Sequence, residues 1–174
     1  SLTADAKLDE PTMRRLAAIL IATTLVAVSC GDDTASDELS VDALEYRTFD
    51  DGIARFDDRV GTRQVINFFA EWCANCIEEM PDFEEVSQEL GDSVAFTGIS
   101  IDADAARALD LVDRTGVTYP VGWDPSEELY AHFGGLSMPT TVFVDADGTV
   151  ARVWSGPLNA DQLRDKIEEF VPNG

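Results

Sequence analysis

Apolar and polar residues alternate along the chain in blocks that predict strands followed by helices. Gln64–Ala70 (QVINFFA) is a nearly continuous apolar run of strand length with a cysteine pair after it, which indicates a buried central strand. The following segment repeats its apolar residues at helical spacing up to Gly91, at Cys76, Met80, Phe83, Val86 and Leu90. This pattern predicts an amphipathic helix, which Pro81 is expected to kink.

The rest of the chain continues the same alternation. Further strands are expected at Val41–Phe49, Ser93–Ile101, Thr140–Val144 and Thr149–Trp154, and further helices at Ala103–Arg114, Ser126–Phe133 and from Asn159 onward. The strand-helix-strand-helix order implies parallel strands, whereas the turn at Asp145–Gly148 makes the last two strands a hairpin. Asn159 with Gln162 three residues later forms a capping box. We therefore expect one α/β domain over residues 41–174.

Residues 13–29 have the pattern of a secretory signal peptide. Met13-Arg14-Arg15 supplies the charged region, and the fourteen residues Leu16–Ser29 supply the apolar region and a small-residue end. Fourteen residues rise only about 21 Å as a helix, short of the hydrocarbon core of about 30 Å, so a permanent membrane span is the less favoured alternative. Residues 1–12 contain no methionine and are not expected to be part of the native start.

The sequence AVSC at residues 27–30 resembles the lipobox of bacterial lipoproteins, in which the cysteine becomes the lipidated first residue. The same letters also fit an ordinary cleavage site that leaves Cys30 as a free thiol. The number of cysteines favours lipidation, because three leave one odd thiol if Cys73 and Cys76 pair. Residues 30–40 are therefore expected to be a lipid attachment site at Cys30 and an acidic tether.

The charge of the chain excludes one class of partner. Thirty-four acidic and twelve basic residues give a formal charge of -22. Residues 1–30 hold three of each sign, so the charge belongs to the remainder. Such a surface repels phosphate backbones, and we expect no nucleic-acid partner.

The motif that carries chemistry is Trp72-Cys73-Ala74-Asn75-Cys76. Two cysteines at a strand-to-helix junction place the first thiol beside unpaired amides and the positive end of the helix dipole, which lowers its pKa. Cys73 is therefore the expected nucleophile. Cys76, one turn into the helix, is positioned to attack the mixed disulfide and is the expected resolving thiol.

Other interpretations of the cysteine pair fit less well. A zinc site needs two more ligands, for which Cys30 and His132 are the remaining candidates of that kind. A c-type haem site requires histidine after Cys76, where Ile77 stands. A purely structural disulfide would close a very short loop and constrain the unfolded chain little. A peroxidase of the P-x-x-x-T-x-x-C pattern would need other residues at Ile66 and Ala70.

With these motifs, the sequence from Leu44 to Val171 resembles the thioredoxin-like proteins, and among them the TlpA/ResA-like extracytoplasmic thiol-disulfide oxidoreductases. The resemblance implies a thioredoxin-like α/β fold, with a central mixed sheet flanked by helices and the C-x-x-C at a helix N-terminus. Met138-Pro139-Thr140 matches the family's cis-proline loop. It implies a cis bond at Pro139 and a backbone at Met138 that pairs with extended substrate.

The resemblance also implies supporting roles around the cysteines. Glu79 lies in the E-x-P pattern that follows the motif in this branch, where the glutamate tunes the pair or relays its protons. From the residues alone, an acid on a helix with acidic neighbours more often faces water. Asn67 stands where cytoplasmic thioredoxins carry a buried aspartate, and because asparagine cannot titrate, any proton relay moves to Glu79. Ala74 and Asn75 form the dipeptide that tunes the reduction potential.

Trp72 is expected to shelter the cysteine pair and to contact substrate, whereas Trp123 and Trp154 are expected in the core. By analogy with the family, the chain is expected to act outside the cytoplasm, on the outer face of a bacterial membrane, without a cofactor or metal. Its expected partners are exported protein thiols or disulfides, a membrane electron carrier and the lipid bilayer. The expected direction is reduction, for example of cysteines that later bind haem in cytochrome c maturation. An oxidant of exported proteins, a thiol peroxidase and a non-catalytic binding module stay as alternatives.

Overall fold

The computed structural model describes residues 39–173. Its elements, in chain order, are β1 (Glu45–Arg47), β2 (Ile53–Arg55), the 3₁₀ turn η1 (Asp57–Arg59), β3 (Arg63–Phe69), α1 (Ala74–Leu90), β4 (Val94–Ser100), α2 (Ala105–Thr115), β5 (Val121–Trp123), α3 (Glu128–His132), β6 (Thr140–Val144), β7 (Val150–Ser155) and α4 (Ala160–Phe170). No helix in this range is both long enough and apolar enough to cross a membrane.

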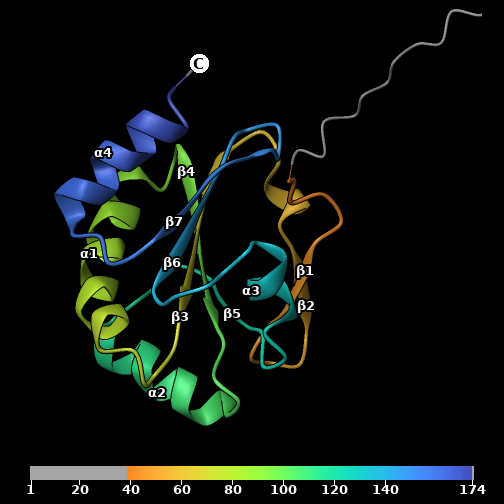
Figure 1. The fold of residues 1–174 in the computed structure, drawn as a ribbon, viewed down its shortest axis with the longest axis vertical. Helices are drawn as coiled ribbons and strands as arrows, with labels where there is room; N and C mark the ends of the chain where they lie inside the picture. The colour runs from red at the N-terminus through yellow and green to blue at the C-terminus, as the bar shows by residue number, and fades with distance from the viewer. Residues whose placement is uncertain (1–38, 174) are drawn as a thin grey trace, which may run out of the picture. The chain divides into compact units, whose positions relative to one another are not determined.

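The strands form one mixed sheet in the order β2-β1-β5-β4-β3-β6-β7. β4 is parallel to β3 and to β5, and the other neighbouring pairs are antiparallel. Helices α1, α2 and α4 lie on one side of this sheet and α3 on the other (Figure 1). α1 and α2 share a side because each connects two parallel strands by a right-handed crossover, and the strand order advances in one direction. This is the thioredoxin-like α/β fold that the resemblance implied.

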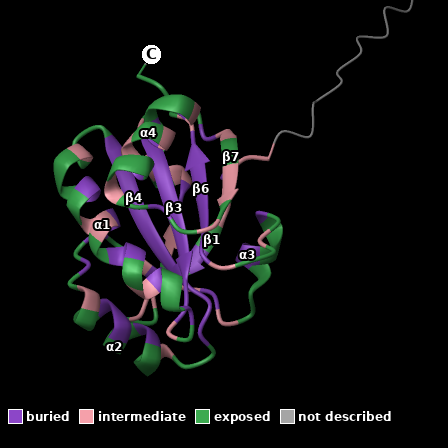
Figure 2. Cartoon of the chain, turned by 60° about the vertical axis from the view of Figure 1, so that its left-hand side comes forward, coloured by how far each residue is buried: buried purple, intermediate pink, exposed green. Residues whose placement is uncertain are grey.

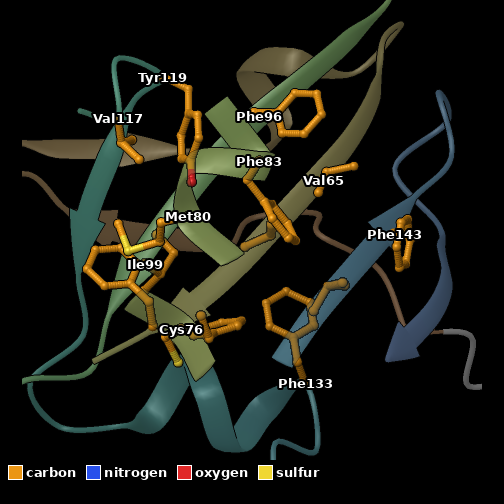
Figure 3. Packing of buried hydrophobic residues seen from close by; sticks show 14 of the residues in the cluster. Val65, Cys76, Met80, Phe83, Phe96, Ile99, Val117, Tyr119, Phe133 and Phe143 are labelled. Atoms are coloured by element: carbon orange, nitrogen blue, oxygen red, sulfur yellow. The ribbon is translucent and has the colours of Figure 1, made fainter. Parts of the chain in front are cut away.

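The core lies on both faces of the central strands. Every residue of β3, β4 and β6 is buried, as Figure 2 shows, which explains why these strands are nearly continuous apolar runs. Because side chains alternate along a strand, β3 serves both layers. Phe68 points to the α3 side, where its ring lies 5.4 Å from Tyr130 and 5.9 Å from Phe133. On the other face, Met80 and Phe83 of α1 belong to one buried cluster with Ile99 (Figure 3).

The predicted helices and long strands are all present, and the differences concern short elements. The strand expected over Val41–Phe49 is limited to three residues, because Ala43 takes a left-handed backbone (φ 59°) before β1 and a turn follows it. β2 and β5, each of three residues, were not predicted. Only glycine fits at position 122 of β5, because a Cβ there would lie 2.2 Å from the ring of Tyr46.

Helix boundaries follow local signals. α1 runs from Ala74 through Pro81 to Leu90, so the proline lies within the helix without ending it. α4 begins at the predicted capping box. The Asn159 side chain accepts a hydrogen bond from the backbone N–H of Gln162, and the Gln162 side chain accepts one from the backbone N–H of Asn159. The sequence signal and the observed hydrogen bonds agree, because both depend only on residues three positions apart.

The described chain enters the domain beside the turn between β6 and β7. The backbone N–H of Val150 donates to the carbonyl of Leu39 at 2.7 Å, and the N–H of Val41 donates to the carbonyl of Gly148 at 2.9 Å. β6 starts at Thr140, directly after Pro139, and ends at Val144. The entry point therefore lies at the end of β6 that is far from Pro139.

Candidate functional site

The cysteine pair forms a disulfide at the start of α1. The Sγ atoms of Cys73 and Cys76 are 2.08 Å apart. Cys73 is the N-cap of α1, and its Sγ accepts a hydrogen bond from the backbone N–H of Cys76 at 3.1 Å. Cys73 is 6% exposed and Cys76 is fully buried. The helix N-terminus favours negative charge at Cys73, which is also the sulfur that an incoming molecule can reach.

The neighbours of Cys73 along the chain are exposed, and the cis-proline loop lies at the same end of the sheet. Trp72 is 65% exposed, so its ring faces solvent more than a sheltering role would suggest. Ala74 and Asn75 in the first turn of α1 are also exposed. Pro139 is buried behind a half-buried Met138, and the bond between them is cis, as predicted. Because Thr140 pairs with Phe68 in the sheet, the cis-proline loop lies at the same end of β3 as the cysteines.

Glu79 is buried within α1, so the alternative that it faces water is wrong. Its side chain is 3% exposed. Oε1 accepts a hydrogen bond from Nδ2 of Asn67 at 2.9 Å, and Oε2 accepts one from the backbone N–H of Leu158 at 3.0 Å. Burial raises the pKa of Glu79 to about 7, although these two hydrogen bonds oppose the rise. A carboxyl group with this pKa exchanges protons readily near neutral pH.

Asn67 connects Glu79 to the sheet. It lies in the middle of β3, is 1% exposed, and pairs in register with Thr141 of β6. Its Nδ2 lies 3.5 Å from the Thr141 hydroxyl in addition to the bond with Glu79, while its Oδ1 is buried without a partner among residues 39–173. Since Cys76 and Glu79 are three residues apart on one helix, both face this region.

A surface cavity of about 220 Å³ reaches Glu79 from outside. The cavity is lined by residues of α1 and of the loop and first turn that lead into α4, namely Asn75, Glu78, Glu79, Asp82, Pro157, Leu158, Asn159 and Gln162. It gives the Glu79 carboxyl a route to solvent that does not pass through the disulfide.

A second buried carboxylate supports the loop before the cysteines. Asp102 follows β4, is 4% exposed, and accepts from the backbone N–H of Glu71 through both oxygens, at 3.0 and 3.2 Å. The hydroxyl of Ser100 donates to it at 2.9 Å. Asp102 therefore fixes the backbone next to Trp72. Asp102 could not be recognised from the sequence, since an aspartate after a strand normally indicates a turn.

The site brings most of the predicted residues together. Cys73 and Cys76 form the disulfide at the start of α1, and Asn67 and Glu79 form one buried, hydrogen-bonded pair. Besides Asp102, two further contributors could not be predicted. Thr141 had only its place in a strand to indicate it, and Leu158 acts through its backbone amide, which no residue type signals. Cys30 and the predicted signal peptide lie outside the described residues.

The remaining tryptophans and the single histidine differ in burial. Trp123 and Trp154 are half-buried rather than fully in the core. Trp123 donates from Nε1 to the carbonyl of Asp102 at 2.6 Å. His132 is exposed at the end of α3. Among residues 39–173, no three histidine, cysteine, aspartate or glutamate side chains are grouped so that they could hold a metal ion.

The chain matches the model of a known protein family. The model of the AhpC/TSA family matches residues 25–153. The thiol-disulfide oxidoreductase ResA of Oceanobacillus iheyensis is 27% identical over 124 residues, which is 71% of this chain and 65% of that protein. The chain therefore spans slightly less than two thirds of the length of this relative.

Two solved structures are similar over most of the described domain. A thiol:disulfide interchange protein DsbE from Chlorobium tepidum superposes with a TM-score of 0.69 at 20% identity, covering 76% of this chain and 95% of that one. The exposed lipoprotein thioredoxin Etrx1 of Streptococcus pneumoniae superposes with a TM-score of 0.61 at 26% identity, covering 72% and 98%. The chain belongs to the AhpC/TSA family, within which it has a thioredoxin-like fold, a C-x-x-C disulfide and sequence relatives named thiol-disulfide oxidoreductase ResA.

Proposed function

We propose that this protein is an exported thiol-disulfide oxidoreductase that reduces disulfides in other exported proteins. The observation that carries the proposal is the disulfide at the N-terminus of α1, in which Cys73 is the more accessible sulfur. In the reduced protein, the Cys73 thiolate attacks a substrate disulfide, forms a mixed disulfide and releases one substrate thiolate. The Cys76 thiolate then attacks Cys73, releases the second substrate thiolate and restores the protein disulfide. Two electrons pass to the substrate.

Glu79 serves this cycle as a proton acceptor. The resolving thiol, Cys76, is fully buried and must lose its proton before it can attack. Glu79 lies one helical turn further, and burial raises its pKa to about 7, so its carboxylate is basic enough to take that proton near neutral pH. The cavity of about 220 Å³ then passes the proton to solvent. Asn67 supports the carboxylate through its side-chain amide.

Substrate contacts come from the loops on both sides of the disulfide. Trp72 offers an exposed aromatic face, and the backbone at Met138, before cis-Pro139, pairs with an extended segment of the substrate. Ala74 and Asn75 set the reduction potential through their effect on the Cys73 thiolate.

The proposed direction of electron flow and the proposed location are inferred by analogy with the family. As a reductant, the protein would be regenerated by a membrane electron carrier and would keep cysteines reduced, for example those that receive haem in cytochrome c maturation.

Residues 13–29 act as a signal peptide and Cys30 as a lipid attachment site, in line with the similarity to a lipoprotein thioredoxin. Mass analysis of the protein isolated from bacterial membranes should show acyl groups on Cys30, and a mature chain without them would indicate plain secretion.

The experiment that tests the direction is the equilibrium reduction potential of the Cys73–Cys76 pair, titrated against a dithiothreitol or glutathione buffer. A value near that of thioredoxin, about -270 mV, supports the reductant, whereas a value near about -120 mV indicates an oxidant.

Peroxide turnover at the rate of dedicated peroxidases would contradict the proposal. A disulfide that resists dithiothreitol in the native protein would indicate a binding module.

A further inference from the structure

Both oxygens of the Glu79 carboxyl group face hydrogen-bond donors. Oε2 accepts from the backbone N–H of Leu158 at 3.0 Å, and Oε1 accepts from Asn67 Nδ2 at 2.9 Å. This arrangement suits a carboxylate, but a carboxylic acid also carries an O–H that needs an acceptor. A backbone N–H can only donate, whereas an asparagine side chain has one donating and one accepting end. Of the two partners, only Asn67 can adapt when Glu79 gains a proton.

Either orientation of the Asn67 side-chain amide leaves one of its two ends without a partner among the described residues. With Nδ2 toward Glu79 and Thr141, its Oδ1 is buried and has no partner among the described residues. If the amide turned over, Oδ1 would face Glu79 and Thr141, and Nδ2 would lose its partners instead. Each orientation leaves one end of the amide unsatisfied, so the protonation state of Glu79 decides between them. The Thr141 hydroxyl fits both, because it can donate or accept.

We propose that the side-chain amide of Asn67 turns over when Glu79 takes up a proton, so that Nδ2 donates to the carboxylate and Oδ1 accepts from the carboxylic acid. Asn67 is then a positioning residue that provides a hydrogen bond for Glu79 in both protonation states. Thr141 follows by reversing its own hydroxyl. The proposal deepens the proposed function and rests on it in one respect, the role of Glu79 as the proton acceptor of Cys76.

Other ionisable groups face Glu79 from the surrounding elements. Asp82 and Glu78 of α1 line the same cavity, and the negative charge of Asp82 favours the neutral form of Glu79. Tyr119, before β5, is buried, and its pKa lies far above the ordinary value because of desolvation and the charge of Glu79. The sulfurs of Cys73 and Cys76 do not titrate while they form the disulfide. The disulfide form is therefore the state in which to test the amide.

The test uses nuclear Overhauser effects in the full, disulfide-bonded chain. At about pH 8.5, where Glu79 is ionised, the Asn67 NH₂ protons should show cross-peaks to the side chain of Thr141. At about pH 5.5 these cross-peaks should disappear, with the same midpoint as the ¹³C titration of the Glu79 carboxyl. Cross-peaks of equal strength at both pH values would mean that Asn67 is a fixed donor, which would overturn the proposal.

Two variants sharpen the result. Glu79→Gln cannot ionise, and its amide can accept from Leu158 while it donates to Oδ1 of Asn67. The cross-peaks should therefore be absent at both pH values, and their presence would contradict the proposal. Asp82→Asn is the matched control, in which the pH-dependent loss should remain. Because no thiol reacts in these experiments, a protein that switches its amide but exchanges no disulfides would contradict only the proposed function.

Discussion

Two glutamates on α1, five residues apart, have pKa values that move in opposite directions. Glu79 faces the sheet and has two donors, and burial raises its pKa to about 7. Glu84 faces the loop before β5, and although its partial burial favours the neutral form, its hydrogen bonds lower its pKa. These come from the backbone N–H and hydroxyl of Thr118, both at 2.7 Å, and from Gln88 at 2.9 Å. The balance between desolvation and donors, rather than the residue type or the helix, decides which acid keeps a proton.

The largest expected effect comes from the attacking cysteine, at the start of the same helix as Glu79. Cys73→Ala should lower the rate of disulfide exchange by about a thousandfold or more, because the attacking thiolate is lost. Reduction of a disulfide-bonded peptide, followed by thiol release, measures this rate. Glu84→Gln is the matched control and should retain the wild-type rate within about twofold. An equal loss in both variants would mean that the two regions do not differ in function.

Next in size is the pH dependence of stability that Glu79 imposes. The pKa of Glu79 is about 7 in the folded protein and 4.5 for an ordinary glutamate, so between these values the folded state holds a proton that the unfolded chain has lost. The free energy of unfolding should therefore fall as the pH rises through this window, by at most about 3 kcal/mol. Urea unfolding of the disulfide form should show this slope, and Glu79→Gln should remove it.

The contribution of Glu84 to the free energy of unfolding should depend on pH with the opposite sign. Its lowered pKa means that it stabilises the fold above the ordinary pKa of a glutamate, and that this contribution is lost as the pH falls through the folded value. Glu84→Gln should cost about 1 kcal/mol near neutral pH, where the charged hydrogen bonds to Thr118 exist, and less in acid. Urea unfolding at two pH values measures the difference. A cost that is constant with pH would show that the charge of Glu84 contributes nothing.

The smallest expected effect is on the surface beside the disulfide. Trp72→Ala should raise the KM for a protein disulfide several-fold while the free energy of unfolding changes by less than about 0.5 kcal/mol, since the ring is 65% exposed. Steady-state kinetics with a folded protein substrate and with a small disulfide would separate the effects. An increase in KM for the protein substrate alone is expected, and a large loss of stability would place Trp72 in the fold rather than in binding.

The sequence predicted the parts of this molecule that depend on local patterns. The strand ending at Phe69, the helix that starts at the cysteines and the capping box at Asn159 all rest on residues a few positions apart. β5 did not have such a pattern, because its three residues are a strand only where β4 and β1 pair with them. A strand this short depends on its partners more than on its own composition.

The residues of the candidate site were also predictable only where a local pattern or the family resemblance indicated them. Cys73 and Cys76 could be recognised from their spacing, and cis-Pro139 from the resemblance to a family. The burial of Glu79 could not be derived from its acidic neighbours on the helix, because it depends on Asn67 of β3 and on Leu158, 79 residues later in the chain. Contacts across such separations are set by the topology of the sheet, which no local periodicity encodes.

The described chain joins the domain at the end of β6 that is far from the cysteines. Leu39 is hydrogen-bonded to Val150 beside the β6–β7 turn, while the cysteines and cis-Pro139 lie at the opposite end of β6. An attachment made directly at Leu39 therefore lies at the end of β6 that does not carry the cysteines. A support linked directly at residue 39 should therefore leave Cys73 accessible to molecules arriving from solution.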